Sequence, residues 1–518
     1  MWRCCWDERK TSEEFFFEKK NQKTFALGVG PPSQHDTFRA VVKGQRFFGS
    51  FFEKRTPFLM TSWDTCCARV AAGEATLLSL WAERPFTVHI AVLENDGITH
   101  EARDFPSLRF PSLGRVHAPA IRLERAIRDL AGLEPVGLAD ERPWLEHGED
   151  PAPYAFLPVQ GDNLHVVRVG PVHAGVIEPG HFRFTCDGET VVRLEARLGY
   201  AHRGVDTLMR GAALGDAAKL AGRISGDSTV AYALAFAHAA EQVSGCDVPP
   251  RAVALRGIMA ELERLANHLG DVGAICNDAS FPLMQAHCAV LRERVLRAAA
   301  GCFGHRLMMD CVVPGGVASD LQRGGAAVLA TTLREVRTRF APLANLYDVT
   351  ASLQDRTVGT GFVSAELARL FGAGGYIGRA SGRDFDARRM PGYPPYDNFT
   401  FLVPVRNDGD VNARIWIRIK EIQQSLTLIE RLLGALPLGA VRSDMQSASG
   451  EGLALVEGFR GDVFVWLRLE EGRVAACHAR DPSWFQWPLL EAAIEGNIIA
   501  DFPLCNKSFN CSYAGQDL

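Results

Sequence analysis

Hydrophobic and polar positions alternate broadly over residues 181–186 and 189–197, on either side of Asp187-Gly188. Alternation with a period of two is typical of a β-strand that buries one face. Asp-Gly between two such runs favours a tight turn, because both residues tolerate a positive φ. The pattern therefore predicts a β-hairpin, with residues 170–173 at one end and a mainly helical region, about 205–345, beyond the other.

Three long segments are predicted to be helices, and one of them shows a clear amphipathic period. The clearest covers residues 251–278 after Pro249-Pro250, with apolar side chains every three or four residues. Two more helices are expected over residues 228–243, capped by Asp227 or Ser228, and over residues 410–436. The first helix also has a charged stripe, which we expect to face solvent or an interface. Its members are Glu261, Arg264, His268, Asp271 and Asp278.

Shorter patterns predict further strands. Residues 86–93 alternate and lead into Asn95-Asp96-Gly97, a hairpin turn signal, so residues 60–150 are expected to form a small α+β unit. Residues 453–477 alternate as well, and the chain is predicted to end in a short helix and a polar tail. The fold class expected from these elements is α+β.

Residues 373–399 are rich in Gly, Pro and Arg and predict a long loop, a kind of segment that is often functional when ordered. Its cluster from Arg379 to Arg388 is most simply salt-bridged to acidic residues, and contact with a neighbouring subunit is the alternative. Residues 1–59 have no helical or strand period. They are interpreted either as a disordered extension or as sequence upstream of a true start at Met60.

Composition narrows the classes of function. The 518 residues are 47% hydrophobic and 23% charged, as in ordinary globular proteins. A net charge of −5 does not support nucleic-acid binding, which usually needs a basic surface. The N-terminus has no signal-peptide pattern and no apolar window reaches about 20 residues, so a cytoplasmic or peripheral protein is expected. The 13 cysteines are expected to be free thiols, since none form a Cys-x-x-Cys pair.

Two Gly-x-Gly segments, at residues 28–30 and 359–361, begin a dinucleotide fingerprint. Neither has the third glycine or a clear strand-to-helix setting. We therefore expect no NAD contact by this chain itself.

Several motifs occur in the order found in one family. The chain reads Gly-Pro-Val-His at 170–173, Glu-Pro-Gly-His-Phe-Arg-Phe at 178–184 and Gly-Tyr-Ala-His-Arg-Gly at 199–204. It resembles the large catalytic-arm subunit of complex I (NADH:quinone oxidoreductase) and the large subunits of energy-converting NiFe hydrogenases of the formate hydrogenlyase type. Further matching segments lie at 261–269, 314–317, 356–361, 379–388, 410–414, 457–461 and 480–483.

The resemblance implies an architecture and a setting. Residues 60–150 resemble a smaller complex I subunit, which proteins of the formate hydrogenlyase type fuse ahead of the large one. Residues 160–518 resemble the large one itself, mainly helical with flanking strands. The implied partners are an iron–sulfur small subunit, a ferredoxin-like subunit and antiporter-like membrane subunits, on the cytoplasmic face of the inner membrane. NAD(H) would be used only by the whole complex, and this chain would not be active alone. The electron donor, the acceptor and the ion pumped stay open.

NiFe hydrogenases hold their metals with four cysteine thiolates, soft ligands that hydroxyls do not replace. Where the family has its first cysteine pair, this chain reads Arg-Ile-Ser-Gly-Asp-Ser, residues 223–228, and near the C-terminus only Cys511 lies in the right region. We therefore expect neither a NiFe centre nor hydrogen chemistry.

In complex I the corresponding cavity receives a quinone. The resemblance places His173 and Asp278 at the positions of proton delivery, with Arg203 and Arg223 as electrostatic support. A histidine suits this role because its pKa lies near neutrality. The alternative is structural: His173 stabilises a loop and Asp278 ends a helix.

Two departures from the family weaken the quinone interpretation. The family's quinone-binding tyrosine aligns with Leu214, which cannot donate a hydrogen bond. The histidine that the family couples to the neighbouring iron–sulfur cluster aligns with Met308. Two functions are therefore carried forward: an oxidoreductase-complex subunit with a quinone cavity, and a non-catalytic scaffold between electron-transfer and ion-translocating partners.

Overall fold

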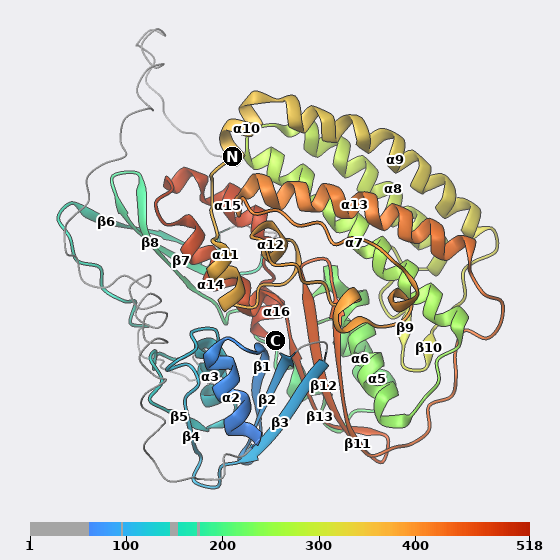
Figure 1. Cartoon of the computed structure of the whole chain (residues 1–518), viewed down its shortest axis with the longest axis horizontal. Coiled ribbons are helices and arrows are strands. Elements are labelled where there is room, and N and C mark those ends of the chain that lie inside the picture. Colours follow the sequence, from blue (N-terminus) through green and yellow to red (C-terminus); the bar gives the residue numbers. More distant parts are fainter. Residues whose placement is uncertain (1–61, 95–96, 146–153, 174–176) are drawn as a thin grey trace.

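The computed structural model describes residues 62–94, 97–145, 154–173 and 177–518 (Figure 1). It combines a layer of long helices with several small sheets, which confirms the α+β class. The N-terminal extension predicted over residues 1–59 lies outside the described residues. Among those that are described, no helix is both long and apolar enough to cross a membrane.

The first sheet comes early in the sequence and contains β1 (Thr76–Glu83), β2 (Thr87–Glu94) and β3 (Gly97–Asp104) in that order. Neighbouring strands are antiparallel, and Glu94 pairs with Gly97, which confirms the predicted hairpin; its two turn residues lie outside the described residues. Helices α2 (Ser62–Ala72) and α3 (Ala120–Ala131) pack against these strands.

A second sheet near the C-terminus contains β11 (Gly450–Glu457), β12 (Asp462–Glu470) and β13 (Arg473–Arg480), as the alternation predicted. One face packs on α6 (Thr229–Ser244). The other faces the first sheet: the ring of Trp81 lies 5.5 Å from that of Trp466, and Arg480 Nε donates to the carbonyl of Leu78 at 2.7 Å. The two sheets thus pack face to face at this contact, and Figure 1 shows them as neighbours.

Four long helices form the bundle at one side of the molecule (Figure 1): α7 (Pro250–Asp278), α8 (Pro282–Phe303), α9 (Gly325–Val349) and α13 (Val411–Gly434). Helices α6, α7 and α13 confirm the predicted helices to within a few residues. Asp410 caps α13 by accepting from the Ala413 amide at 2.7 Å. Ser228 precedes α6 but makes no capping bond; Glu263 accepts from the amides of Val230 and Ala231 instead.

The charged stripe on α7 was expected to face solvent or an interface, and the first of these alternatives is wrong. Glu261, Arg264 and His268 are at most 1% exposed, and Asp271 is buried as well. Their partners lie on α13 and in the segment before it: His268 Nε2 is 2.7 Å from Glu421 Oε2, and Arg388 Nη1 donates to Glu261 at 2.9 Å. The stripe is buried because each charge meets an opposite charge or a hydrogen-bond partner on a neighbouring element.

The segment predicted as a long loop, residues 373–399, contains α12 (Gly375–Ala380) and short helical turns. Arg379 and Arg388 are completely buried rather than exposed on a loop surface. Arg379 forms ion pairs with Glu421 at 2.6 Å and Glu457 at 2.8 Å. The prediction that these arginines are salt-bridged is confirmed. We call these residues the ionic network: Glu261, Arg264, His268, Arg379, Asp386, Arg388, Glu421 and Glu457.

The predicted hairpin is present as β7 (His181–Asp187) and β8 (Thr190–Arg197), with β6 (Leu164–Val169) added on the β7 side. Helix α14 (Ser483–Ile494) packs on β8. The turn requires glycine at Gly188, where φ is +55°.

The end of the chain differs from the polar tail that was predicted. After α15 (Phe502–Phe509), the chain forms α16 (Tyr513–Asp517), whose Gln516 and Asp517 are buried. The carboxylate of Asp517 accepts from the amides of Gly199 and Ala201 at 2.8 and 2.9 Å. The last residues pack inside the molecule in spite of their polarity, because they form hydrogen bonds with the backbone amides of the loop after β8. We call residues 502–518 the C-terminal segment.

Candidate functional site

His173 lies in the loop before β7, with its ring against Phe182 and Tyr513, at centroid distances of 5.6 and 6.1 Å. Its Nε2 is 3.5 Å from the Tyr513 hydroxyl, at the limit of a hydrogen bond. Partial burial lowers the pKa of His173. The imidazole is therefore neutral at pH 7 and acts as a donor or acceptor according to its tautomer.

Asp278 is the last residue of α7 and is half-buried. Burial raises the pKa of its carboxyl group, and the positive charge of Lys507 on α15 opposes this rise. A carboxyl group held in this way keeps its proton to a higher pH than an exposed aspartate, which suits it to proton transfer.

The structure does not bring His173 and Asp278 into direct contact: within the described residues, no hydrogen bond or ion pair joins them. Each faces the C-terminal segment instead. Tyr513 of that segment lies beside His173, and Lys507, six residues earlier, is the cation near Asp278. The C-terminal segment therefore lies at both predicted positions, and sequence reasoning missed its part in the site.

Arg203 and Arg223 do lie together. Arg203 donates to the carbonyls of Arg223 and Ile224 at 2.9 and 2.7 Å, and its own amide donates to the carbonyl of Leu518 at 2.7 Å. Arg223 forms a two-bond ion pair with Asp310, at 2.7 and 2.8 Å. Arg203 thus fixes the backbone ahead of Ser225, while the charge of Arg223 is neutralised by Asp310.

The place of the family's metal ligands holds hydroxyl groups that are hydrogen-bonded. Ser225 Oγ lies 2.9 Å from Ser512 Oγ, and Ser228 Oγ accepts from Arg460 at 3.2 Å. Arg460 also pairs with Asp227 at 2.5 Å. Cys511 directly precedes Ser512, and burial raises the pKa of its thiol, which keeps it protonated.

These donors do not fit a NiFe centre. Such a centre needs several thiolates, whereas the positions here offer hydroxyl groups and a neutral thiol. Among the described residues, no group of three or more His, Cys, Asp or Glu side chains is arranged to hold a metal ion.

The two departures from the family take up ordinary structural positions. Leu214 begins α5 (Leu214–Ala221) and is partly buried. Met308 is 3% exposed and lines a small cavity together with Glu263. Burial raises the pKa of Glu263 to about 8. No feature of the sequence pattern singled out this carboxyl group, because its raised pKa depends chiefly on burial in the folded chain.

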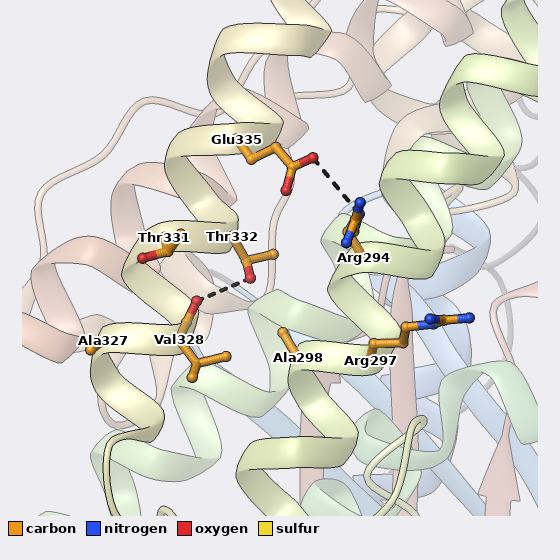
Figure 2. A pocket seen from close by; sticks show the side chains of 8 residues that line it. All are labelled: Arg294, Arg297, Ala298, Ala327, Val328, Thr331, Thr332 and Glu335. Atoms are coloured by element: carbon orange, nitrogen blue, oxygen red, sulfur yellow. Dashed lines mark hydrogen bonds and ion pairs between the residues drawn. The ribbon is translucent and has the colours of Figure 1, made fainter.

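An open groove of about 540 Å³ lies between α8 and α9, away from all of these residues. Figure 2 shows Arg294 and Glu335 facing each other across it, at 3.8 Å, and Arg297 directed outward. Thr332 bonds the carbonyl of its own helix at Val328. The polar groups that line the groove in the described structure are satisfied locally or point to solvent, so they do not converge to fix a ligand.

Comparison with known proteins agrees with the shared motifs. Residues 282–449 match the family described as "Respiratory-chain NADH dehydrogenase, 49 Kd subunit". The chain is 29% identical over 436 residues to formate hydrogenlyase subunit 5 of Escherichia coli, covering 79% of this chain and 77% of that protein. It is 29% identical over 356 residues to an NADH-quinone oxidoreductase subunit of Syntrophobacter fumaroxidans, covering 67% of this chain and 95% of that protein.

A solved structure shares the fold. It is a chain of a membrane-bound sulfane sulfur reductase, an archaeal respiratory membrane complex, with a TM-score of 0.65 and 24% identity over 69% of this chain and 99% of that one. The resemblance drawn from the motifs is therefore confirmed: the chain is similar to subunits of NADH-quinone oxidoreductase and of formate hydrogenlyase.

Proposed function

We propose that this chain is the large subunit of a membrane-associated respiratory oxidoreductase complex, in which it presents a quinone-type site rather than a NiFe centre. The observation that carries the proposal is the hydrogen-bonded pair Ser225 and Ser512, 2.9 Å apart. Ser225 lies in the segment where the resemblance puts the family's first cysteine pair, and Ser512 follows Cys511 directly. The surrounding frame is kept: the loops at 170–173 and 199–204 are both tied to the C-terminal segment.

The proposed reaction is reduction of a quinone to a quinol, which takes up two electrons and two protons. The electrons would come from an iron–sulfur cluster in a small partner subunit. His173 would relay one proton, donating from one ring nitrogen while it accepts a proton from solvent at the other, and Asp278 would supply the second proton and then regain one from solvent. Arg203 and Arg223 would hold the loop at 223–228 in place, since their side chains bind its backbone and Asp310.

We further propose that residues 60–150 correspond to the smaller catalytic-arm subunit of complex I, fused ahead of residues 160–518, which correspond to the large one. The β1 to β3 sheet lies against the C-terminal sheet, as expected of two units that work together. The partners would be an iron–sulfur small subunit, a ferredoxin-like subunit and antiporter-like membrane subunits, at the cytoplasmic face of the membrane.

The test is photo-crosslinking of a quinone analogue to the complex purified from its native membranes, followed by peptide mapping. The proposal is supported if the analogue labels peptides that contain His173 or the end of α7 and if excess quinone prevents this labelling. An intact complex without such labelling contradicts it.

One alternative has a specific observation in its favour. Leu214 and the buried Met308 replace two residues that the family uses for quinone binding and for cluster coupling. A non-catalytic scaffold would tolerate both replacements. In that case the complex would keep its electron transfer when His173 and Asp278 are both substituted, whereas a quinone-reducing subunit would lose it.

A further inference from the structure

Three histidines from different strands meet at the contact between the two face-to-face sheets. His89 of β2, His100 of β3 and His478 of β13 surround Trp81 of β1. The rings of His89 and His478 are stacked on the indole, with centroids at 5.0 and 4.8 Å and interplanar angles of 9° and 5°. We call Trp81, His89, His100 and His478 the histidine seam.

The polar contacts of the seam limit how many protons it can hold. His89 Nδ1 and His100 Nε2 are 3.1 Å apart, so one proton lies between them, and a second would place two N–H donors face to face. His478 Nε2 is 2.8 Å from the Ser79 hydroxyl across the sheets. His89 is 2% exposed, so water cannot solvate an added charge on its ring.

Charged groups surround the seam at longer distances. The nearest carboxylates in the described structure are Glu83, 3.8 Å from His89; Glu451, 3.8 Å from His100; and Asp206, 3.6 Å from His478. The other charged side chains near the seam already have partners. Arg468 forms ion pairs with Glu83 and Glu470, and Arg480 forms one with Asp462. Glu101 accepts a hydrogen bond from the Ser62 hydroxyl. Burial lowers the pKa of His89 to about 3, and His100, His478 and Arg468 act in the same direction.

We propose that the histidine seam is a pH-sensitive clamp, which holds the N-terminal sheet against the C-terminal sheet while His89 and His100 are neutral and loosens when they take up protons. The direction follows from linkage. A separated imidazole titrates near 6.5, whereas burial holds the pKa of His89 near 3 and lowers that of His100. Between these values the separated state binds more protons, so the contact weakens as pH falls.

The test is hydrogen exchange, measured by mass spectrometry on the complex from native membranes at neutral pH and at about pH 5, with intrinsic rates corrected. Peptides of β1 and β13 are expected to exchange about tenfold faster at the lower pH, as linkage through one buried imidazole allows. Helices α3 and α6, on the outer faces of the two sheets, are expected to keep their protection.

Substitution identifies the groups responsible. The variant H89F/H100F keeps flat rings in the seam but removes two ionisable groups, so its exchange should no longer depend on pH. The matched control is H117F: His117 is buried in the same N-terminal region, with a pKa lowered to about 4 by burial, but lies outside the seam, so the acceleration should remain.

Three results would overturn the proposal: equal exchange at the two pH values, acceleration that persists in H89F/H100F, or deprotection of α3 together with β1, which means unfolding of the whole N-terminal region. If H89F/H100F does not assemble, H89F alone decides. The linkage is assigned chiefly to His89, so an undiminished acceleration in H89F also contradicts the clamp.

Discussion

The ionic network and the C-terminal segment both keep polar groups away from water, but they do so in opposite ways. In the network each buried charge meets an opposite charge: the carboxylate of Glu421 contacts His268, Arg264 and Arg379. The C-terminal segment relies on neutral hydroxyls and on backbone amides, as in the pairs of Ser512 with Ser225 and of Asp517 with Gly199.

The difference affects how easily the residues in each region can be replaced. A paired buried charge cannot be exchanged alone, because its partner would be left unpaired in a dry interior. A neutral hydroxyl group can be exchanged more easily, because its removal leaves only a hydrogen bond unmade. The comparison teaches that the ionic network supports the fold, whereas the C-terminal segment can vary with a smaller loss of stability.

The largest effect is expected in the network. Arg379→Leu removes the cation shared by Glu421 and Glu457 and should lower the free energy of unfolding by about 3–5 kcal/mol. Urea denaturation of the full chain measures it. The control is Arg389→Leu, which breaks an exposed pair with Asp384 and should cost less than about 1 kcal/mol. Equal losses in the two variants would show that burial of the pair is not decisive.

Next in size is the effect expected at His173, which lies beside the C-terminal segment. Under the proposed function, His173→Gln keeps hydrogen-bonding capacity but cannot relay a proton between two ring nitrogens, so quinone reduction by the complex should fall about 100-fold. His165→Gln, an exposed position on β6, serves as the control and should leave the rate unchanged. An unaltered rate in the His173 variant would favour the scaffold over the enzyme.

A smaller effect is expected at the serine pair. Ser512 caps α16 by accepting from the Gly515 amide at 2.9 Å and also bonds Ser225. Ser512→Ala should destabilise residues 513–518 by about 1–2 kcal/mol, seen as faster hydrogen exchange there. Ser225→Ala keeps the cap and should have roughly half the effect. If the two variants were equal, the cap would contribute nothing.

The smallest expected effect concerns Asp278. Burial raises the folded pKa of this carboxyl group above its unfolded value, so the folded state binds more protons in that interval. Its contribution to stability is therefore full below the unfolded pKa, near 4, and declines as pH rises through the folded pKa. In Asp278→Asn this shallow decline should disappear from urea unfolding measured across pH. Asp348→Asn, at an exposed position, should retain it.

The local sequence pattern was sufficient to predict an element where the surroundings of its residues follow from their neighbours along the chain. The hairpin around Gly188, helix α7 after Pro249 and the strands over 450–480 all appeared where period and turn chemistry placed them. The loss of the thiolate set followed from residue identity alone, because serine at 225 and 228 is not a soft ligand in any fold.

The errors share one physical cause. The charged stripe on α7 and the polar chain end were expected to be solvated, because the free energy of burying a charge depends on partners distant in sequence. Glu421, 153 residues after His268, makes that burial favourable, and the loop at 199–204 does the same for Asp517. The sequence by itself therefore determined the elements, the family and the loss of the metal ligands. Tertiary structure alone decided which charges are buried, that Tyr513 lies beside His173, and that three histidines meet across two sheets.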